Sequence, residues 1–486
     1  MAASLRRDRI SAVDTAWLRM DRPHNLMMIC GVLELERRVK IARLRAVIEE
    51  RFLLFRRFRQ KAVLRPALAM WETDANFDID RHVIEVKLPG RAGKRELQQL
   101  VSELAATPLA PDRPMWQFHL VSNHGSRSAV IVRIHHSYAD GMALVRVMLS
   151  MTDTVKGIPA MPFHPRTRKR AVQDDSILSP FFEPMGGAMK AAGTIASKLL
   201  EQGTGIWRDP GKAAELMSQG GALTAEAAHL AFMQSDSPTR FKGHPAVSKR
   251  VAWAEPLPLD EVKTVGRALS ASVNDVLLSC VAGAIRDYLA AKGDPTEGVM
   301  LRALIPVNLR PPEEAWRLGN RFGLVFLELP IGTANPVARL YQVRASMNQL
   351  KGSYQPILAM GILAAMGAGP RALQEVLLHT LARNASAVMT NVPGPQQPLY
   401  IAGARIDDIM FWVPQSGDIG VGVSIISYAG KVMFGLIVDE GMCPDPEAIV
   451  ARFRPQFEQL VYATLMAWPR DGDLDAAVVE RVAGSV

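Results

Sequence analysis

Two adjacent histidines, followed at a fixed distance by an Asp-Gly pair, are the residues of this chain best suited to chemistry. They lie in the stretch AVIVRIHHSYADGM at residues 129–142, as His135, His136, Asp140 and Gly141. An imidazole changes its charge near neutral pH, so it can exchange protons with a substrate. A buried imidazole without such a task needs hydrogen-bond partners. The pair therefore indicates either a proton-transfer site or two satisfied core histidines.

The surrounding sequence predicts a strand that ends at the histidines and a helix that begins soon after them. Residues 128–136 are rich in β-branched residues, and MALVRVMLSM after Gly141 has helical spacing without a breaker. Asp140 is placed to cap that helix. Neighbouring side chains of a strand point to opposite faces, so we expect one histidine to face the chemistry and the other to be packed. Asp140 is the only further metal ligand nearby, and its capping role competes with coordination, so no metal is expected.

Length and composition predict a soluble globular protein of two domains. The chain has 486 residues, of which 48% are hydrophobic and 22% charged. That length exceeds what one hydrophobic core usually supports. The three cysteines are widely spaced and odd in number, so they predict no disulfide framework or metal site and favour a cytoplasmic location. The N-terminus lacks the apolar region of a signal peptide.

The net charge of +9 comes partly from basic clusters at residues 6–9, 51–61 and 166–170. Such clusters attract phosphates of a nucleic acid, an anionic lipid or a cofactor, or they form a solvated face. No nucleic-acid partner is expected, because no zinc pattern, basic zipper or aromatic RNA-binding signature accompanies the charge. In 51–59 arginines alternate with apolar residues, which suits either contact with a membrane surface or the core-packed end of a helix. The uncharged stretch 352–370 predicts a buried or surface-embedded helix.

The positions of proline- and glycine-rich segments divide the chain into three parts. Residues 1–155 form a first α/β domain, with strands at 27–35, 114–122 and 128–136 and helices at 40–55 and 94–105. Residues 156–245, rich in proline, form an interdomain connection that is partly helical. Residues 246–486 form a second α/β domain, with strands at 249–259, 299–309, 320–330, 385–395, 418–428 and 431–440. Its helices lie at 272–293 and 446–466.

Several familiar chemistries have no motif in the chain. It contains no G-x-S-x-G elbow, no G-x-x-x-x-G-K-[ST] phosphate loop and no H-E-x-x-H. The glycines of GDIGVG at 417–422 lie in a strand region and introduce no helix, so they predict no dinucleotide site. The histidine motif is therefore the strongest functional signal.

The stretch HHSYADG matches the HHxxxDG motif of the CoA-dependent acyltransferase superfamily. Three further elements, RPMWQFHLV, SVNDVLLS and TNVPGP, resemble those of one branch, the bacterial wax ester synthase/diacylglycerol acyltransferase family. The resemblance extends along nearly the whole chain. Met115 stands where the family has leucine, a departure that conserves volume.

The resemblance implies a fold of two chloramphenicol-acetyltransferase-like α/β domains, with the active-site tunnel at their interface. It implies transfer of a long-chain fatty acyl group from acyl-CoA to a fatty alcohol or diacylglycerol, giving wax ester or triacylglycerol. His136 is then the general base, and His135 packs and orients the strand end. Asp140 holds the loop through a cap or an ion pair, for which Arg310 is a suggested partner. A thioester is already activated, so no cofactor and no enzyme nucleophile are expected.

Other candidates follow from the same elements. Asn274 is the candidate oxyanion donor, although Ser272 and Asp275 around it also form a helix-capping pattern. Gly141 either leaves room for the thioester or makes a tight turn. The further substrate-binding candidates are Asp275, Trp116, Asn391 and Gly394, of which Trp116 is expected mainly to pack.

Two other functions remain open. A peptide-synthetase condensation domain shares HHxxxDG but uses a carrier-protein thioester. A non-catalytic coat of lipid inclusions would use the basic and Met-rich surfaces for binding. The basic-apolar segment and the lipid substrates also predict peripheral contact with a membrane or a lipid inclusion.

Overall fold

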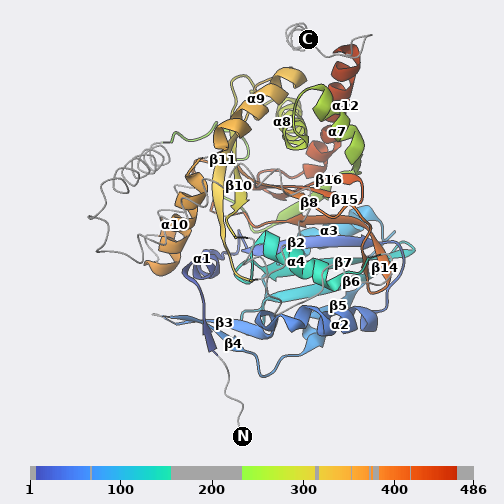
Figure 1. The fold of residues 1–486 in the computed structure, drawn as a ribbon, viewed down its shortest axis with the longest axis vertical. Helices are drawn as coiled ribbons and strands as arrows, with labels where there is room; N and C mark the ends of the chain where they lie inside the picture. The colour runs from blue at the N-terminus through green and yellow to red at the C-terminus, as the bar shows by residue number, and fades with distance from the viewer. Residues whose placement is uncertain are drawn as a thin grey trace.

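The computed structural model describes residues 7–65, 68–154, 233–311, 317–351, 353–370, 374–375, 383–415 and 417–467. Within these ranges the chain forms two halves, each built on a mixed β-sheet and stacked along the long axis of the molecule (Figure 1). The N-terminal half, blue to cyan, lies below the C-terminal half in that view. The α/β class and the two-domain arrangement predicted from the sequence are confirmed.

The N-terminal half is built on a six-stranded sheet with the order β13-β14-β2-β7-β6-β5. Its strands are β2 (Met28–Leu35), β5 (Val83–Val86), β6 (Trp116–His124), β7 (Arg127–His135), β13 (Tyr400–Ile401) and β14 (Ala404–Trp412). Strands β2 and β7 are buried along almost their whole length, which explains their nearly continuous apolar sequences. The helices of this half are α1 (Ala12–Met20), α2 (Ile41–Glu50), α3 (Lys94–Ala105) and α4 (Gly141–Met151). A small sheet of β1 (Arg7–Arg9), β4 (Ala69–Thr73) and β3 (Gln60–Leu64) lies at its outer end (Figure 1).

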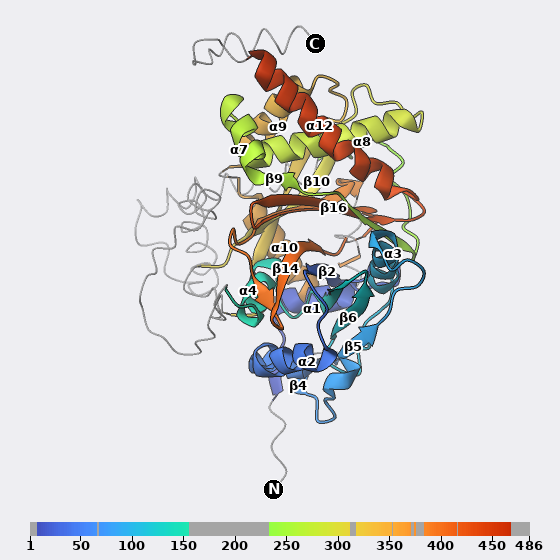
Figure 2. The ribbon, with the colours of Figure 1, turned by 90° about the vertical axis from the view of Figure 1, so that its right-hand side faces the viewer.

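The C-terminal half has a seven-stranded sheet with the order β11-β10-β12-β15-β16-β8, in which β9 also pairs with β16. Its strands are β8 (Lys249–Trp253), β9 (Leu257–Pro258), β10 (Leu301–Asn308), β11 (Phe322–Leu329), β12 (Ala387–Pro393), β15 (Val421–Tyr428) and β16 (Lys431–Asp439). Its helices are α7 (Leu259–Ala268), α8 (Val273–Ala291), α9 (Pro336–Leu350), α10 (Gln355–Ala368) and α12 (Pro446–Ala467). Figure 2 shows α7, α8, α9 and α12 above this sheet, whose other face is turned toward the N-terminal half.

Two strands from the second half of the chain, β13 and β14, join the N-terminal sheet, so the sheets do not follow the predicted domain boundaries. Strand β14 comes from the second half of the chain but pairs with β2, so that Phe411 lies opposite Gly31 (Figure 2). A Cβ at Gly31 would come within 3.3 Å of Phe411, so the close pairing favours glycine there. Residues 246–486 are therefore not a self-contained domain. Strand β14 was not predicted from the sequence. Hydrophobic periodicity also carries no information on which sheet a strand joins. Of the predicted connection 156–245, residues 156–232 lie outside the described residues, and 233–245 contain no helix or strand.

The segment 51–59 sends three of its apolar side chains, Phe52, Leu53 and Phe58, into the core. Helix α2 ends at Glu50, and two short 3-10 turns follow, η1 (Phe52–Leu54) and η2 (Arg56–Arg59), where the sequence predicted helix to residue 55. Phe52 and Phe58 are fully buried and stack with ring centroids 3.9 Å apart. Of the two readings of this segment, the core-packed helix end fits its apolar side chains, although Leu54 is exposed.

The uncharged stretch 352–370 contains helix α10, which packs against α1 and β11. Within the described ranges, no single helix is both long enough and apolar enough to cross a membrane. Helices α7 and α8 reach the required length and apolarity only as a pair, and they are bent by 98° where they meet.

Candidate active site

The two histidines lie where strand β7 gives way to helix α4, as the sequence predicted. His135 is the last residue of β7, and Gly141 is the first of α4. Asp140 is the N-cap of α4, and its Oδ1 accepts a hydrogen bond of 2.9 Å from the amide of Ala143. The strand and the capped helix therefore fix both ends of the loop that carries His136.

His136 is held by its main chain and by aromatic rings. Its amide donates to the carbonyl of Met27 at 2.7 Å. Its ring stacks on Trp17 with centroids 4.2 Å apart, and Phe322 lies at 5.6 Å on a tilted plane. Burial lowers the pKa of His136 to about 4, although Asp140 opposes this effect. The imidazole is therefore neutral at pH 7, the state that a proton acceptor needs.

His135 is buried on the opposite side and is occupied locally. Its Nδ1 lies 2.8 Å from the hydroxyl of Ser137 and accepts from the Ser137 amide at 3.1 Å. Its Nε2 lies 3.7 Å from the carboxylate of Asp21. These contacts agree with the prediction that His135 packs and orients the strand end.

Asp140 joins the two halves of the molecule. Its Oδ2 accepts from the guanidinium of Arg310 at 2.6 Å and from the amide of Arg321 at 3.0 Å. Both side chains of the Asp140–Arg310 ion pair are almost completely buried. Arg310, the suggested partner, is thus paired with Asp140, and both carboxylate oxygens of Asp140 are used in hydrogen bonds that hold the loop. The described residues contain no group of three His, Cys, Asp or Glu side chains that could hold a metal ion.

Gly319 and Asn320, from the C-terminal half, contact the histidine loop, and the sequence did not predict this contact. Gly319 exchanges backbone hydrogen bonds with Tyr138 and Asp140. The side-chain amide of Asn320 donates to the carbonyl of His136 at 2.7 Å. The sequence predicts only that NRFG, at residues 320–323, begins a strand. Nothing in the sequence shows that its first residue reaches a loop almost 200 positions away.

His136 lines a cavity of about 450 Å³ between the two halves. Aliphatic, methionine and aromatic side chains from β10, β11, β12 and β14 form most of its wall, among them Leu304, Phe322, Met389 and Phe411. Four of the predicted substrate-site residues also line it: Gly141, Asn274, Asp275 and Asn391. A Cβ on Gly141 would meet no atom within 4 Å, and its backbone is not left-handed. Gly141 therefore borders open space, and its role in leaving room for the thioester stays a prediction.

Asn274 has a hydrogen-bond donor to spare. Its Oδ1 accepts from Asn391 at 2.7 Å, whereas its Nδ2 has only a weak contact of 3.9 Å to the sulfur of Met347. The capping reading of this region is also confirmed, because Asp275 accepts from the amide and the hydroxyl of Ser272 at 2.9 and 2.7 Å. The cap fixes the first turn of α8, and that turn presents Asn274 to the cavity.

Two predicted substrate-binding residues are not among those that line this cavity. Trp116 is fully buried, donates from its indole to the carbonyl of Phe58 at 2.8 Å and stacks on His82. Its large ring fills the core, as its packing role predicted. A Cβ on Gly394 would lie 2.5 Å from the carbonyl oxygen of Ser427, so this glycine permits close backbone packing. We correct both assignments from substrate binding to structure.

A neutral imidazole at the wall of an apolar cavity between two mixed α/β halves is the arrangement expected of a two-domain acyltransferase. Two family models cover most of the chain. The model of the wax ester synthase/diacylglycerol acyltransferase catalytic domain matches residues 10–277, and that of the WS/DGAT C-terminal domain matches residues 318–461. The chain belongs to the wax ester synthase/diacylglycerol acyltransferase family. Its reaction is the acyl transfer that gives this family its name.

Individual relatives agree with this membership. A candidate diacylglycerol O-acyltransferase of Mycobacterium tuberculosis H37Rv is 30% identical over 414 residues, which cover 80% of this chain and 77% of the relative. A probable diacylglycerol O-acyltransferase of the same strain is 27% identical over 398 residues, which cover 80% of this chain and 81% of the relative. The solved wax ester synthase/diacylglycerol acyltransferase of Marinobacter aquaeolei VT8 has the same fold, with a TM-score of 0.67 at 20% identity, covering 94% of this chain and 99% of that one. The starter condensation domain of rhizomide synthetase shares the fold more distantly, with a TM-score of 0.56 at 13% identity over 94% of each chain.

Proposed function

We propose that this enzyme moves a long-chain fatty acyl group from acyl-CoA to the hydroxyl of a fatty alcohol or a diacylglycerol, with His136 as general base. The single observation that carries the proposal is a neutral imidazole at the wall of an apolar cavity. A base of this kind typically contributes about 10² to 10⁴ in rate. Acyl-CoA enters as a substrate, and the reaction needs no cofactor.

The reaction requires one proton to move twice. His136 takes the hydroxyl proton as the alcohol oxygen attacks the thioester carbonyl, which forms a tetrahedral intermediate and an imidazolium. The intermediate then breaks its C–S bond, and the imidazolium returns the proton to the departing CoA thiolate. The products are an ester and free CoA, and the base is regenerated.

The oxyanion of the intermediate needs a hydrogen-bond donor, and Asn274 supplies one. Its amide hydrogens lack a strong acceptor, while Asn391 fixes the amide by donating to its oxygen. We expect Asn274→Ala to lower kcat about 10²-fold with little change in KM, since the donor acts on charge that develops only during the reaction. An unchanged kcat would remove Asn274 from this role.

The assay uses purified protein, palmitoyl-CoA and either a long-chain alcohol or a diacylglycerol. Release of free thiol measures the first product, and extraction of the lipid identifies the ester. The parent enzyme should form ester from free acyl-CoA, whereas His136→Ala should form at least about 10²-fold less. A condensation-type enzyme would instead be inactive on free acyl-CoA and require a carrier-protein thioester.

We also propose that the protein touches a lipid surface through the tip of the β3–β4 hairpin. Leu64 and Leu68 are 48% and 39% exposed there, beside the exposed Arg65 and Arg9. Exposed leucines flanked by arginines suit the boundary of an anionic bilayer, where apolar burial and charge attraction act together.

Flotation with vesicles of phosphatidylglycerol and phosphatidylcholine tests this contact. Leu64→Glu with Leu68→Glu should move the protein from the floating to the bottom fraction. Val247→Glu is the matched control, because Val247 is equally exposed but lies in the C-terminal half. Equal flotation of all three proteins would argue against the hairpin.

A further inference from the structure

Two enclosed polar atoms next to the active-site cavity lack hydrogen-bond partners among the described residues. One is Nδ1 of His136, and the other is Oδ1 of Asn320. Buried polar atoms are nearly always hydrogen-bonded, so each orphaned atom needs an explanation. These two belong to residues that already touch, because the Asn320 side chain donates to the His136 carbonyl.

The orientation of the Asn320 amide follows from its neighbours. Its Nδ2 donates to the carbonyl of His136 at 2.7 Å and to Oδ1 of Asp14 at 2.8 Å. Both neighbours can only accept, so the NH₂ group must lie on that side. The amide oxygen of Asn320 is therefore turned away from them. The backbone amide of Asn320 also donates to Asp14 at 2.9 Å, which anchors the residue.

We infer that Asn320 is a positioning residue whose Oδ1 accepts the Nδ1–H of His136 and so keeps Nε2 unprotonated toward the cavity. A neutral imidazole carries one proton, and the nitrogen that lacks it is the base. The opposite tautomer would present an N–H to the alcohol and could not accept its proton. This inference rests on the proposed role of His136 as base and goes beyond it by naming what selects the tautomer.

The electrostatic surroundings of His136 agree with this contact. Burial is the largest influence and lowers the pKa of His136 to about 4, while a hydrogen bond to the Asn320 side chain is among the influences that raise it. Charged or titratable groups approach the ring and its loop from several elements: His135, Asp140, Asp14, Arg310 and Arg321. The carboxylates among them are engaged by Asn320 or by arginine, so the neutral amide oxygen is the free acceptor.

Asn320 belongs to the C-terminal half, and His136 to the N-terminal half. The tautomer of the base is thus set by contact between the halves. Trp17 and Phe322 likewise hold the ring from the two halves. Correct protonation would exist only where the halves are joined.

The test compares the full-length parent, Asn320→Ala and Asn123→Ala. Asn123 is a matched control, because its amide also makes two backbone hydrogen bonds, both with Leu88 at 2.8 and 2.9 Å, far along β6 from His136. Histidine labelled with ¹⁵N in the ring reports each tautomer, and a His136→Ala spectrum identifies the His136 signals. Steady-state kinetics with palmitoyl-CoA and a long-chain alcohol accompany the spectra.

In the parent, His136 should carry its proton on Nδ1. Asn320→Ala should shift this signal toward the other tautomer and lower kcat about 10-fold or more, with KM changed less than about 2-fold. Asn123→Ala should leave the tautomer and kcat as in the parent. A parent His136 protonated on Nε2 would overturn the inference without any variant having to fold, and so would an Asn320→Ala enzyme with unchanged tautomer and kcat. Full activity of His136→Ala would instead refute the base itself, and the tautomer spectrum would still report on Asn320.

Discussion

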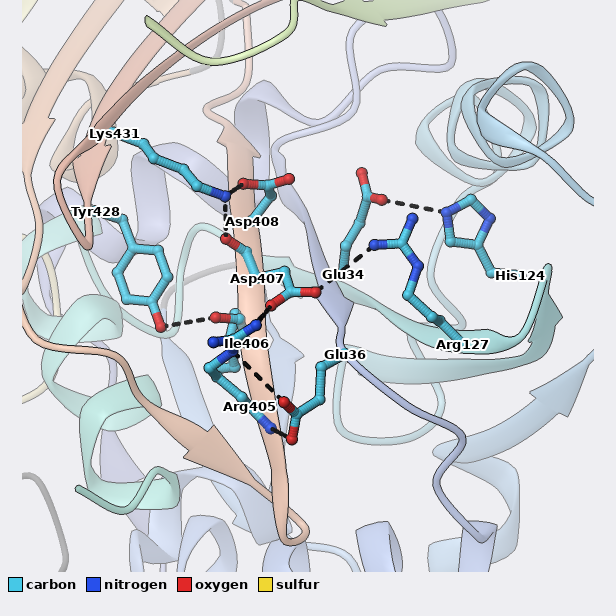
Figure 3. Close-up of polar contacts among 10 residues, drawn as sticks. All are labelled: Glu34, Glu36, His124, Arg127, Arg405, Ile406, Asp407, Asp408, Tyr428 and Lys431. Carbon is cyan, nitrogen blue, oxygen red and sulfur yellow. Dashed lines mark hydrogen bonds and ion pairs between the residues drawn. The ribbon is translucent and has the colours of Figure 1, made fainter. Parts of the chain in front are cut away.

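Among the described residues, two buried histidines each line a cavity between the halves, and their surroundings differ. His136 borders a cavity of about 450 Å³ and His124 one of about 520 Å³. The Nε2 of His124 lies 3.1 Å from the carboxylate of Glu34 (Figure 3). Its Nδ1 lies 3.2 Å from the carbonyl of Ala92. Both ring nitrogens of His124 are therefore occupied by protein groups, and the carboxylate of Glu34 is one of them.

Two residues that line the second cavity, Arg127 and Asp408, belong to a row of ion pairs. Figure 3 shows this row along β14 and the neighbouring strands: Arg405 with Glu36 and Asp407, Arg127 with Asp407, and Lys431 with Asp408. These pairs bind the crossing strand β14 to both halves. Most of the charged side chains that line this cavity already have partners, so it offers a ligand few free ionic groups in spite of its larger volume. The paired ones are Glu34, Lys94, Arg127, Glu255 and Asp408.

The comparison shows that burial alone does not mark a functional histidine. His119 is also buried with an unpartnered Nδ1, yet it is not among the residues that line either cavity. His136 combines an unmet hydrogen-bonding group with access to an apolar space. Replacing His136 and His124 should therefore damage different properties.

Replacement of His136 should have the largest effect, and it should fall on the rate. His136→Ala is expected to lower kcat/KM about 10² to 10⁴-fold, because the general base is lost. The variant should unfold within about a few degrees of the parent, because the ring takes part in no ion pair and its inferred hydrogen bond to the neutral Asn320 amide contributes only about 1 kcal/mol. Thiol release and thermal unfolding measure the two properties. A His136→Ala enzyme as unstable as His124→Ala would erase the distinction between the two histidines.

Breaking the Asp140–Arg310 pair should reduce both stability and activity. Arg310→Met leaves the buried Asp140 carboxylate without its cation, which typically costs about 3–5 kcal/mol. The loop that carries His136 loses its link to the C-terminal half at the same time. The double variant Asp140→Asn with Arg310→Met should recover part of the thermal midpoint, since no unpaired charge remains. Equal destabilisation of the single and double variants would contradict this reading.

The sequence predicted the strand, cap and helix around His136 because each depends on neighbouring residues. Helix α3 covers the same residues, 94–105, as its predicted counterpart, and Asp140 caps α4 as expected. The contacts that shape the base come from distant segments. Trp17 lies in an N-terminal helix and Asn320 lies just before β11, and neither has a local pattern that points to position 136. Arg310 was only suggested, since charge alone does not select one arginine among many.

Replacement of His124 should affect stability and spare the rate. Glu34 is buried itself, but the hydrogen bond from His124 and nearby cations hold its pKa below the usual value. His124→Ala leaves this carboxylate without its partner, at a cost of about 2–3 kcal/mol. We expect kcat for ester formation to stay within about 2-fold of the parent. The Glu34→Gln variant is the control, because it removes the charge and should tolerate the loss of His124 better.

The pH dependence separates the two histidines most finely. Because the folded pKa of His136 is about 4, below its ordinary value of 6.5, the base stays neutral and kcat/KM should not decline as pH falls from 7 to about 5. Half of the activity should be lost near pH 4. Stability follows the same sign, since the unfolded chain binds a proton at this site between pH 6.5 and 4 and the folded chain does not. His136→Phe should therefore lose less stability than the parent over that interval, whereas His124→Ala should leave the acid limb of kcat/KM in place. If kcat/KM instead fell by half near pH 6.5, the ring would be solvated during turnover. Only the contacts of the two histidines would then distinguish His136 from His124.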